Sequence, residues 1–213
     1  MNVGGIILSG GKSSRMGWPK AELPFGPELM LQRVVRLLGQ IVEPLIVVAA
    51  AQQELPPLPP QVRVVRDRRQ GRGPLEGLGA GLAALQGDAE AAYATSCDVP
   101  LLVPQFVQLL LRRRGDYQVV VPVDGEFYHP LAAVYRIDVL AEIQALLAAD
   151  QLRPRCLFER VRTCRVPVEE LRTVDPDLLT LANLNTPADY AATVHRAGWE
   201  IPAELLKALA NPS

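Results

Sequence analysis

The sequence predicts an α/β domain in which helices cover both faces of a mostly parallel β-sheet. Its 213 residues suit one domain of ordinary size, and hydrophobic residues make up 49% of them, which is enough for a substantial core. Short apolar segments alternate with amphipathic segments along the chain, an order typical of strands that alternate with helices. The apolar segments are continuous, as expected for strands that are buried on both faces.

The first half of the chain carries the clearest elements. Strands are expected at residues 3–8, 44–50, 62–65, 91–96 and 118–123. Helices are expected at residues 29–41, 75–85 and 104–114. The first of these helices has its apolar residues at helical spacing, and a proline at the first position supports the third. Residues 52–61 contain four prolines, so we expect a loop there.

The second half is less regular. Strands are expected at residues 130–135 and 163–168, and helices at residues 139–149, 187–197 and 202–210. The sequence contains no internal repeat, no low-complexity tract and no linker between domains. We therefore treat residues 1–213 as one domain.

Charge and cysteine content argue against several classes of protein. The 22 Lys and Arg residues almost balance the 23 Asp and Glu residues, so no overall charge favours nucleic acid or an anionic membrane as a partner. Cys97, Cys156 and Cys164 form neither a CxxC pair nor a zinc spacing, which favours a reducing compartment. We expect no signal peptide and no membrane span, and therefore a cytoplasmic protein.

A segment rich in glycine and cations, LSGGKSSRMGWPK, follows the first strand. Loops at the carboxyl ends of strands hold the ligands of open α/β sheets. Gly10 and Gly11 let the backbone approach a phosphate or a base and offer N–H donors, while Lys12, Arg15 and Lys20 bring positive charge. A triphosphate that loses pyrophosphate needs this combination.

Two motif interpretations of this segment do not fit, and one structural alternative stays open. The letters GKS match the end of a P-loop, but the first glycine of that pattern would fall on Ile6, inside the strand, and no GxGxxG fingerprint is present. A glycine-rich turn with solvated basic side chains stays possible on this segment alone.

A lone aspartate, Asp98, follows the fourth strand in the segment TSCDVPL. Mg²⁺ commonly binds one or two carboxylates together with phosphate oxygens, so Asp98 suits a magnesium ligand if the first and fourth strands are neighbours. The alternative is that Asp98 caps the helix expected from Pro104. Cys97, beside it, is interpreted as a small buried residue and not as a nucleophile.

Glycines are also frequent after the third strand. Asp67 is expected to end that strand, and a Gly-Pro pair then opens a helix that contains Gly77, Gly79 and Gly81. Each glycine inside a helix costs about 1 kcal/mol relative to alanine. The helix therefore either packs closely on the sheet or lets a ligand approach its backbone, and the sequence leaves both open.

The fourth informative segment is NLNTPAD. Thr186 and Pro187 suit the N-cap and the first position of a helix. Asn185 then stands just before the helix, with its side-chain oxygen available to a metal or a hydroxyl group. Neither histidine suggests catalysis, since His129 lies in a turn and His195 on a helix face that we expect to be solvated.

In these four segments the chain resembles the molybdenum cofactor guanylyltransferases of the MobA type, in the nucleotide-diphospho-sugar transferase superfamily. The family pattern runs LAGGxSxRMGxDK, then D with GPLxG, then CDxP, then NxNTPxD. This chain matches these motifs in order over nearly its whole length.

The resemblance implies a three-layer α/β/α, Rossmann-like fold and a nucleotidyltransferase that uses Mg²⁺. The donor would be GTP and the acceptor molybdopterin, normally already carrying molybdenum, with the guanine dinucleotide and pyrophosphate as products. The nucleotide-binding half would span about residues 1–115 and the acceptor-binding half about residues 116–200. Proteins of molybdopterin synthesis or molybdoenzymes would be partners.

The resemblance also implies roles for single residues. It assigns nucleotide binding to Leu8, Ser9, Gly10, Gly11, Lys20, Asp67 and Asp98, with Mg²⁺ on Asp98. The groups expected to act in catalysis are Arg15, Lys20 and Asp98. Asn185 is a candidate contact to the metal or the acceptor, and the turn at His129 is expected to face the acceptor.

Three departures from the family pattern leave rival functions open. Pro19 stands where the guanylyl enzymes usually have aspartate, Ser9 replaces an alanine, and the second strand leads into VVAAA where the family places an asparagine. Cytidylyl transfer to molybdopterin or to a sugar phosphate is therefore an alternative, although the Gly10-Gly11 pair favours a purine. A non-catalytic molybdopterin-binding adaptor is a second alternative, and retention of Lys20 and Asp98 argues against it.

Overall fold

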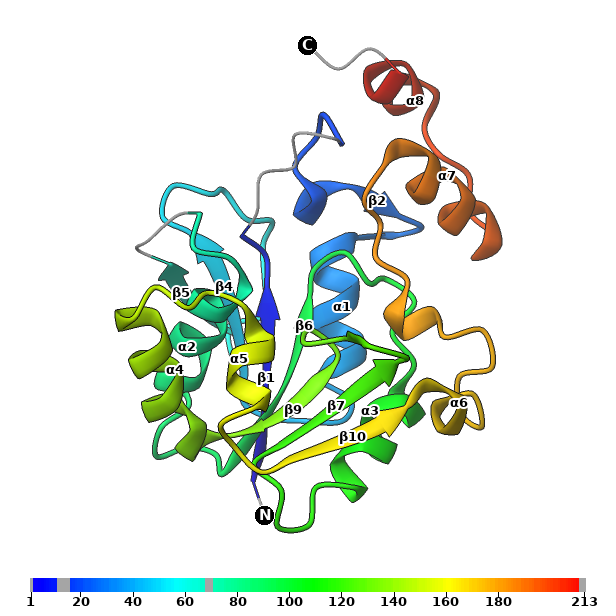
Figure 1. The fold of residues 1–213 in the computed structure, drawn as a ribbon. Helices are drawn as coiled ribbons and strands as arrows, with labels where there is room; N and C mark the ends of the chain where they lie inside the picture. Colours follow the sequence, from blue (N-terminus) through cyan, green and yellow to red (C-terminus); the bar gives the residue numbers. More distant parts are fainter. Residues whose placement is uncertain (1, 11–15, 68–70, 211–213) are drawn as a thin grey trace.

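A central sheet with helices on both faces forms the body of the molecule (Figure 1). The computed structural model describes residues 2–10, 16–67 and 71–210. Within these residues eight strands form the main sheet in the order β10-β7-β9-β6-β1-β4-β5, with β8 paired to β7. The strands are β1 (Val3–Leu8), β4 (Leu45–Ala50), β5 (Arg63–Asp67), β6 (Ala91–Ser96), β7 (Val119–Asp124), β8 (Phe127–Tyr128), β9 (Ala133–Arg136) and β10 (Thr163–Pro167).

Most neighbouring strands are parallel. β1 lies between β4 and β6, β4 also pairs with β5, and β7 pairs with β10, all in parallel. β9 is inserted antiparallel between β6 and β7, so those two strands run in the same direction. The carboxyl ends of β1, β4, β5, β6, β7 and β10 therefore lie along one side of the sheet, which we call the carboxyl edge.

Two apolar layers hold the helices against the sheet. α1 and α3 cover one face through residues such as Leu31 and Phe106, and α2 and α4 cover the other through Leu78 and Ile143. The helices are α1 (Met30–Leu38), α2 (Pro74–Ala84), α3 (Pro104–Arg112), α4 (Leu140–Ala148), α5 (Pro154–Phe158), α6 (Val168–Leu171), α7 (Pro187–Arg196) and α8 (Ala203–Ala210). This arrangement confirms the predicted α/β/α fold class with a mostly parallel sheet.

A third apolar cluster lies outside these layers. It joins α7 and α8 to the segment that contains β2 (Pro24–Phe25) and β3 (Glu28–Leu29). In Figure 1 this part of the molecule stands beyond the carboxyl edge, beside the body of the sheet. No helix in the described parts of the chain is long and apolar enough to cross a membrane.

The glycines of α2 fit the close-packing interpretation. A Cβ atom on Gly81 would lie 2.6 Å from Ile6 Cγ2, and one on Gly77 would lie 3.2 Å from Leu8 Cδ2. A Cβ atom on Gly79 would lie 3.1 Å from Ile143 Cγ2, on α4. The absence of side chains at these positions lets α2 approach both the sheet and its neighbouring helix.

Candidate active site

Asp98 lies at the carboxyl edge, two residues beyond the end of the central strand β6. Its side chain is 12% exposed, and its Oδ2 lies 2.7 Å from Lys20 Nζ. The other carboxylate oxygen accepts a hydrogen bond from Ser96 Oγ. The N-cap of α3 is Val103, so the structure does not support the alternative in which Asp98 caps that helix.

Lys20 reaches Asp98 from a separate part of the chain. It begins a short 3₁₀ turn, η1 (Lys20–Glu22), in the segment that precedes β2. Its ammonium group also donates a hydrogen bond of 3.1 Å to Asn185 Oδ1, in the segment before α7. The structure therefore brings together Lys20, Asp98 and Asn185, three residues that the sequence had singled out in separate motifs.

The contact with Lys20 shows how Asn185 is held while no substrate is bound. Its side-chain oxygen, a candidate contact to a metal or the acceptor, accepts a hydrogen bond from the ammonium group of Lys20 in this structure, and its second lone pair is not used by that bond. The expected N-cap and first helical position are confirmed: the Thr186 side chain accepts from Asp189 N, and Pro187 begins α7.

β1 leads directly into the nucleotide-binding segment that the sequence predicts. Leu8 ends β1 and is 8% exposed, with Ser9 and Gly10 directly after it. The N–H groups of Ser9 and Gly10 both donate to Val48 O, at 2.8 and 3.3 Å. Gly10 therefore does not offer its N–H group to a ligand as expected, because the neighbouring strand β4 already uses it. Gly11, Lys12 and Arg15 lie outside the described residues.

Gln53 is a polar residue at this site to which sequence analysis gave no role. Its Nε2 donates to Ser9 O at 3.1 Å and to Ser9 Oγ at 3.0 Å, while its Oε1 accepts from Ala50 N at 3.2 Å. Arg66 supports this turn by donating to Ala50 O at 3.1 Å. The family pattern places an amide side chain just after this strand, so the proline-rich loop was the place to search for one.

Asp67 ends β5 as predicted and is half-buried. β5 is two strands from β1, and neighbouring strands are about 4.8 Å apart, so Asp67 stands about 10 Å along the carboxyl edge from the end of β1. This position lies on the side of Asp98 opposite to β7 and β10.

The neighbouring thiol is unsuited to nucleophilic chemistry. Cys97 is 4% exposed, and burial, together with the charge of Asp98, raises the pKa of its thiol to about 12. The thiol therefore stays protonated at neutral pH, in agreement with a packing role. His195 is exposed on α7, while burial lowers the pKa of His129, whose ring packs edge-on against Phe127.

The side-chain oxygen atoms at the site suit a metal ion whose remaining ligands come from the substrate phosphates and water. No group of three or more His, Cys, Asp and Glu side chains in the described residues could hold a metal ion. However, the Asp98 carboxylate and the Asn185 amide oxygen converge on one cation, the ammonium group of Lys20. Mg²⁺ prefers such oxygen donors and usually completes its shell with phosphate oxygens and water.

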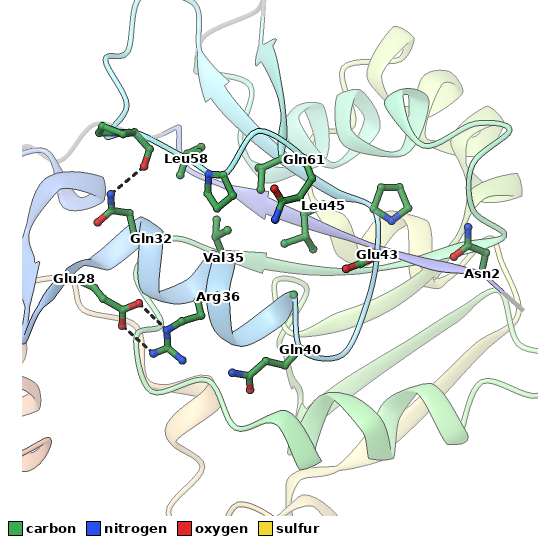
Figure 2. Close-up of a pocket in the computed structure, with 15 residues that line it drawn as sticks. Asn2, Glu28, Gln32, Val35, Arg36, Gln40, Glu43, Leu45, Leu58 and Gln61 are labelled. Carbon is green, nitrogen blue, oxygen red and sulfur yellow. Dashed lines mark hydrogen bonds and ion pairs between the residues drawn. The ribbon is translucent and has the colours of Figure 1, made fainter.

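A groove of about 930 Å³ lies elsewhere, between α1 and the proline-rich loop (Figure 2). Its lining includes Asn2, Pro44 and Leu45, at the beginnings of β1 and β4, and the ion pair of Glu28 with Arg36. The beginnings of these strands are at the opposite end of the sheet from Asp98. The candidate active site is therefore identified by its converging side chains and not by this groove.

Comparison with known proteins identifies the family. Residues 5–164 match the MobA-like NTP transferase domain. A probable molybdenum cofactor guanylyltransferase of Mycobacterium ulcerans (strain Agy99) is 40% identical over 199 residues, which cover 91% of this chain and 94% of that protein. The corresponding protein of Mycobacterium avium (strain 104) is 38% identical over 197 residues, covering 90% of this chain and 95% of that protein.

Solved structures share the fold. The crystal structure of molybdopterin-guanine dinucleotide biosynthesis protein A from Archaeoglobus fulgidus has a TM-score of 0.74 at 20% identity, and covers 93% of this chain and 99% of that one. Rv0371c from Mycobacterium tuberculosis H37Rv, in complex with manganese, has a TM-score of 0.64 at 17% identity, with 92% and 99% covered. The chain therefore belongs to the MobA-like NTP transferase family, and it is a nucleotidyltransferase.

Proposed function

We propose that this enzyme transfers GMP from GTP to the phosphate of molybdopterin, normally as Mo-molybdopterin, and releases pyrophosphate. The product would be molybdopterin guanine dinucleotide, formed in molybdenum cofactor biosynthesis. The observation that carries the proposal is the convergence of Lys20, Asp98 and Asn185 at the carboxyl edge. The names and the 37–40% identity of the mycobacterial relatives support the choice of substrates.

The proposed reaction is an in-line displacement at phosphorus. An oxygen of the acceptor phosphate forms a bond to the α-phosphorus of GTP, and the bond from that phosphorus to the bridging oxygen of pyrophosphate breaks. Lys20 binds the phosphates and offsets the negative charge on the leaving group, with Arg15 as a second cation. Mg²⁺, when bound through Asp98, would neutralise charge on the same phosphates.

The position of Lys20 suits a residue that pairs with Asp98 in the free enzyme and with the substrate phosphates when they bind. Its ammonium group lies 2.7 Å from Asp98 Oδ2, and its side chain is 18% exposed, so a triphosphate can reach it. When Mg²⁺ and the triphosphate bind, Asp98 would turn to the metal and Lys20 to the phosphates. The ion pair thus keeps both groups in place while no substrate is bound.

The base and ribose of GTP would lie over the ends of β1, β4 and β5. Leu8, Ser9, Gly10 and Gly11 would line the base, and Asp67 would contact the nucleoside. A Cβ atom on Gly10 would lie 3.3 Å from Ala50 N, so this glycine leaves the approach to the β4 turn open. Gln53 holds the backbone oxygen of Ser9, and thus fixes the wall against which a base would pack.

The acceptor would occupy the other side of Asp98, in the half formed by residues 116–200. There the hairpin of β7 and β8 lies at the carboxyl edge. Two guanidinium groups lie near the Tyr128 ring, with Arg155 at 5.9 Å and Arg165 at 5.8 Å from its centroid, and Arg165 Nε donates to its hydroxyl at 2.8 Å. An aromatic ring with two cations suits an acceptor that combines a fused heteroaromatic ring with a phosphate.

Pyrophosphate release tests the proposal directly. The enzyme is mixed with Mg²⁺, molybdopterin and each of GTP, CTP, ATP and UTP in turn, and the product is identified by mass spectrometry. We expect release with GTP, dependent on the acceptor, and a dinucleotide of the corresponding mass. If triphosphates raise the melting temperature of the protein but no pyrophosphate is released, the result would instead favour a non-catalytic molybdopterin-binding adaptor.

A further inference from the structure

The last part of the chain forms a small unit that packs on residues 16–30 instead of on the sheet. These residues carry Lys20, and we call them the lysine segment. We call residues 183–210 the C-terminal unit, which contains α7 and α8. Its apolar residues share one cluster with the segment that carries Lys20. The members of this cluster are Met16, Leu23, Phe25 and Met30 from that segment and Leu184, Tyr190, Val194, Ile201, Leu205 and Leu209 from the C-terminal unit.

Two contacts show how closely these parts fit. Tyr190 is fully buried, and its hydroxyl donates a hydrogen bond of 2.5 Å to Pro24 O. Gly26 lies against Trp199 so closely that a Cβ atom there would be 2.6 Å from the indole ring. The match to the family domain ends at residue 164, so the C-terminal unit lies beyond it.

A chain of polar contacts runs from the C-terminal unit to Asp98. Asp189 Oδ2 accepts from Asn185 N at 3.1 Å and from Thr186 N at 2.9 Å. Asn185 Oδ1 in turn accepts from Lys20 Nζ at 3.1 Å. A backbone hydrogen bond also links the C-terminal unit directly to Asp98, since Leu184 N donates to Asp98 O at 3.0 Å.

The charge state of Asp189 fits this arrangement. A hydrogen bond with the Thr186 side chain is the main cause that holds the pKa of Asp189 below its usual value, and desolvation opposes it. The backbone N–H groups of Asn185 and Thr186 and the charge of Lys20 lower the pKa further. Asp189 is therefore ionised at neutral pH and can accept both backbone hydrogen bonds. It touches neither Asp98 nor Lys20 through any hydrogen bond that the described residues show.

We infer that Asp189 is a positioning residue, which fixes Asn185 so that its amide oxygen holds the Lys20 ammonium group next to Asp98. The significance of this inference for catalysis rests on the proposed function, but the positioning itself does not. The C-terminal unit thus supplies the third member of the site and sets the orientation of its cation. A helix cap with no such role would stabilise α7 and leave Lys20 unchanged.

The chain offers a direct readout, since its three lysines are Lys12, Lys20 and Lys207. Acylation by an amine-reactive reagent, followed by peptide mass spectrometry, gives the labelling rate of each in the full-length protein. Lys20 is 18% exposed and held by two partners, whereas Lys207 is exposed on α8 and serves as the internal reference. We expect Asp189→Ala to label Lys20 several-fold faster relative to Lys207.

Three further variants make the test specific. Asp189→Asn keeps an acceptor oxygen and should restore nearly the wild-type rate. Asp177→Ala removes an exposed carboxylate, outside the helices, that pairs with Arg196 at the end of α7, and it should leave the labelling rate of Lys20 unchanged. In an Asn185→Ala background, Asp189→Ala should have no further effect on Lys20, although it should still lower the melting temperature.

The inference would be overturned if the labelling rate of Lys20 were unchanged in folded Asp189→Ala. It would also be overturned if Asp189→Ala raised that rate by the same factor in the Asn185→Ala background as in the wild type. Pyrophosphate release, measured with the same proteins, distinguishes failure of the positioning role from failure of the proposed function. If wild type turns over GTP and Lys20 labelling does not respond to Asp189, only the positioning role fails. If Lys20 responds as expected but wild type releases no pyrophosphate, only the proposed function fails.

Discussion

At the scale of single residues, the contact between Lys20 and Asp98 joins two motifs that are 78 positions apart in the sequence. Sequence analysis could predict both residues as site candidates, because each follows a buried strand and carries the charge that a metal-bound triphosphate needs. It could not predict that they pair with each other, or that Asn185 joins them. Such pairing depends on how the loops fold, and no local spacing encodes it.

Replacing Lys20 with alanine removes a fixed cation from the phosphates. We expect Lys20→Ala to lower kcat by about two to three orders of magnitude, as is typical when one group that stabilises transition-state charge is lost. The circular dichroism spectrum should stay that of the wild type, since the side chain is not part of an apolar layer. Lys207→Ala is the matched control, and a near-normal kcat in Lys20→Ala would contradict the phosphate role.

Asp98→Asn tests the metal ligand. An amide has nearly the same shape but binds a hard cation weakly, so the variant should fold and lose most of its Mg²⁺-dependent activity. The measurement is pyrophosphate release as a function of Mg²⁺ concentration. Unaltered activity with the original Mg²⁺ dependence would place the metal elsewhere.

Cys97→Ser should leave kcat within a few-fold of wild type. Burial, with the charge of Asp98 as a second cause, raises the pKa of the thiol to about 12, so the thiolate is absent at neutral pH. For the same reason, the pH–rate profiles of wild type and Cys97→Ser should have the same shape between about pH 6 and 9. An inactive but folded Cys97→Ser would show that the thiol takes part in the reaction.

At the scale of elements, the longer helices and strands were predictable and the shortest were not. Continuous apolar segments marked β1 and β6 at their observed bounds, because a strand buried on both faces needs apolar residues throughout. The hairpin of β2 and β3 has two-residue strands, which are too short to show any period. α5 and α6 are similarly short, with five and four residues.

The glycines of α2 give a prediction at this scale. The Cβ atom added by Gly81→Ala would lie 2.6 Å from Ile6, so the helix or the strand has to shift. Overpacking costs about 1–3 kcal/mol, and a contact as short as 2.6 Å should place the cost above the gain of about 1 kcal/mol that alanine brings to a helix. Urea denaturation should therefore show a net loss of up to about 2 kcal/mol.

Gly79→Ala is the comparison variant, because its Cβ atom would meet Ile143 at the longer distance of 3.1 Å. It should cost less than Gly81→Ala. Equal or greater stability of Gly81→Ala would mean that α2 does not press on the sheet as closely as the structure shows.

At the scale of the whole molecule, the proposed function divides the carboxyl edge between two substrates, on either side of Asp98. Asp98 follows the central strand β6, with β1, β4 and β5 on one side and β9, β7 and β10 on the other. The order of strands and helices predicted a mostly parallel sheet, but it did not predict that β9 would insert antiparallel between β6 and β7. The C-terminal unit was predicted as helices only, since its packing on the lysine segment depends on contacts between distant parts of the chain.

The choice of base is the central functional claim, and kcat/KM for each triphosphate with molybdopterin as the acceptor tests it most directly. Guanine offers an O6 acceptor and an N2 donor, and a site that pairs them rejects an analogue that leaves a buried polar group unpaired. We predict that kcat/KM for GTP exceeds the values for CTP and ATP by at least about tenfold. A higher value for CTP would contradict guanylyl transfer while leaving nucleotidyl transfer intact, and Pro19 would be the first residue to replace with aspartate.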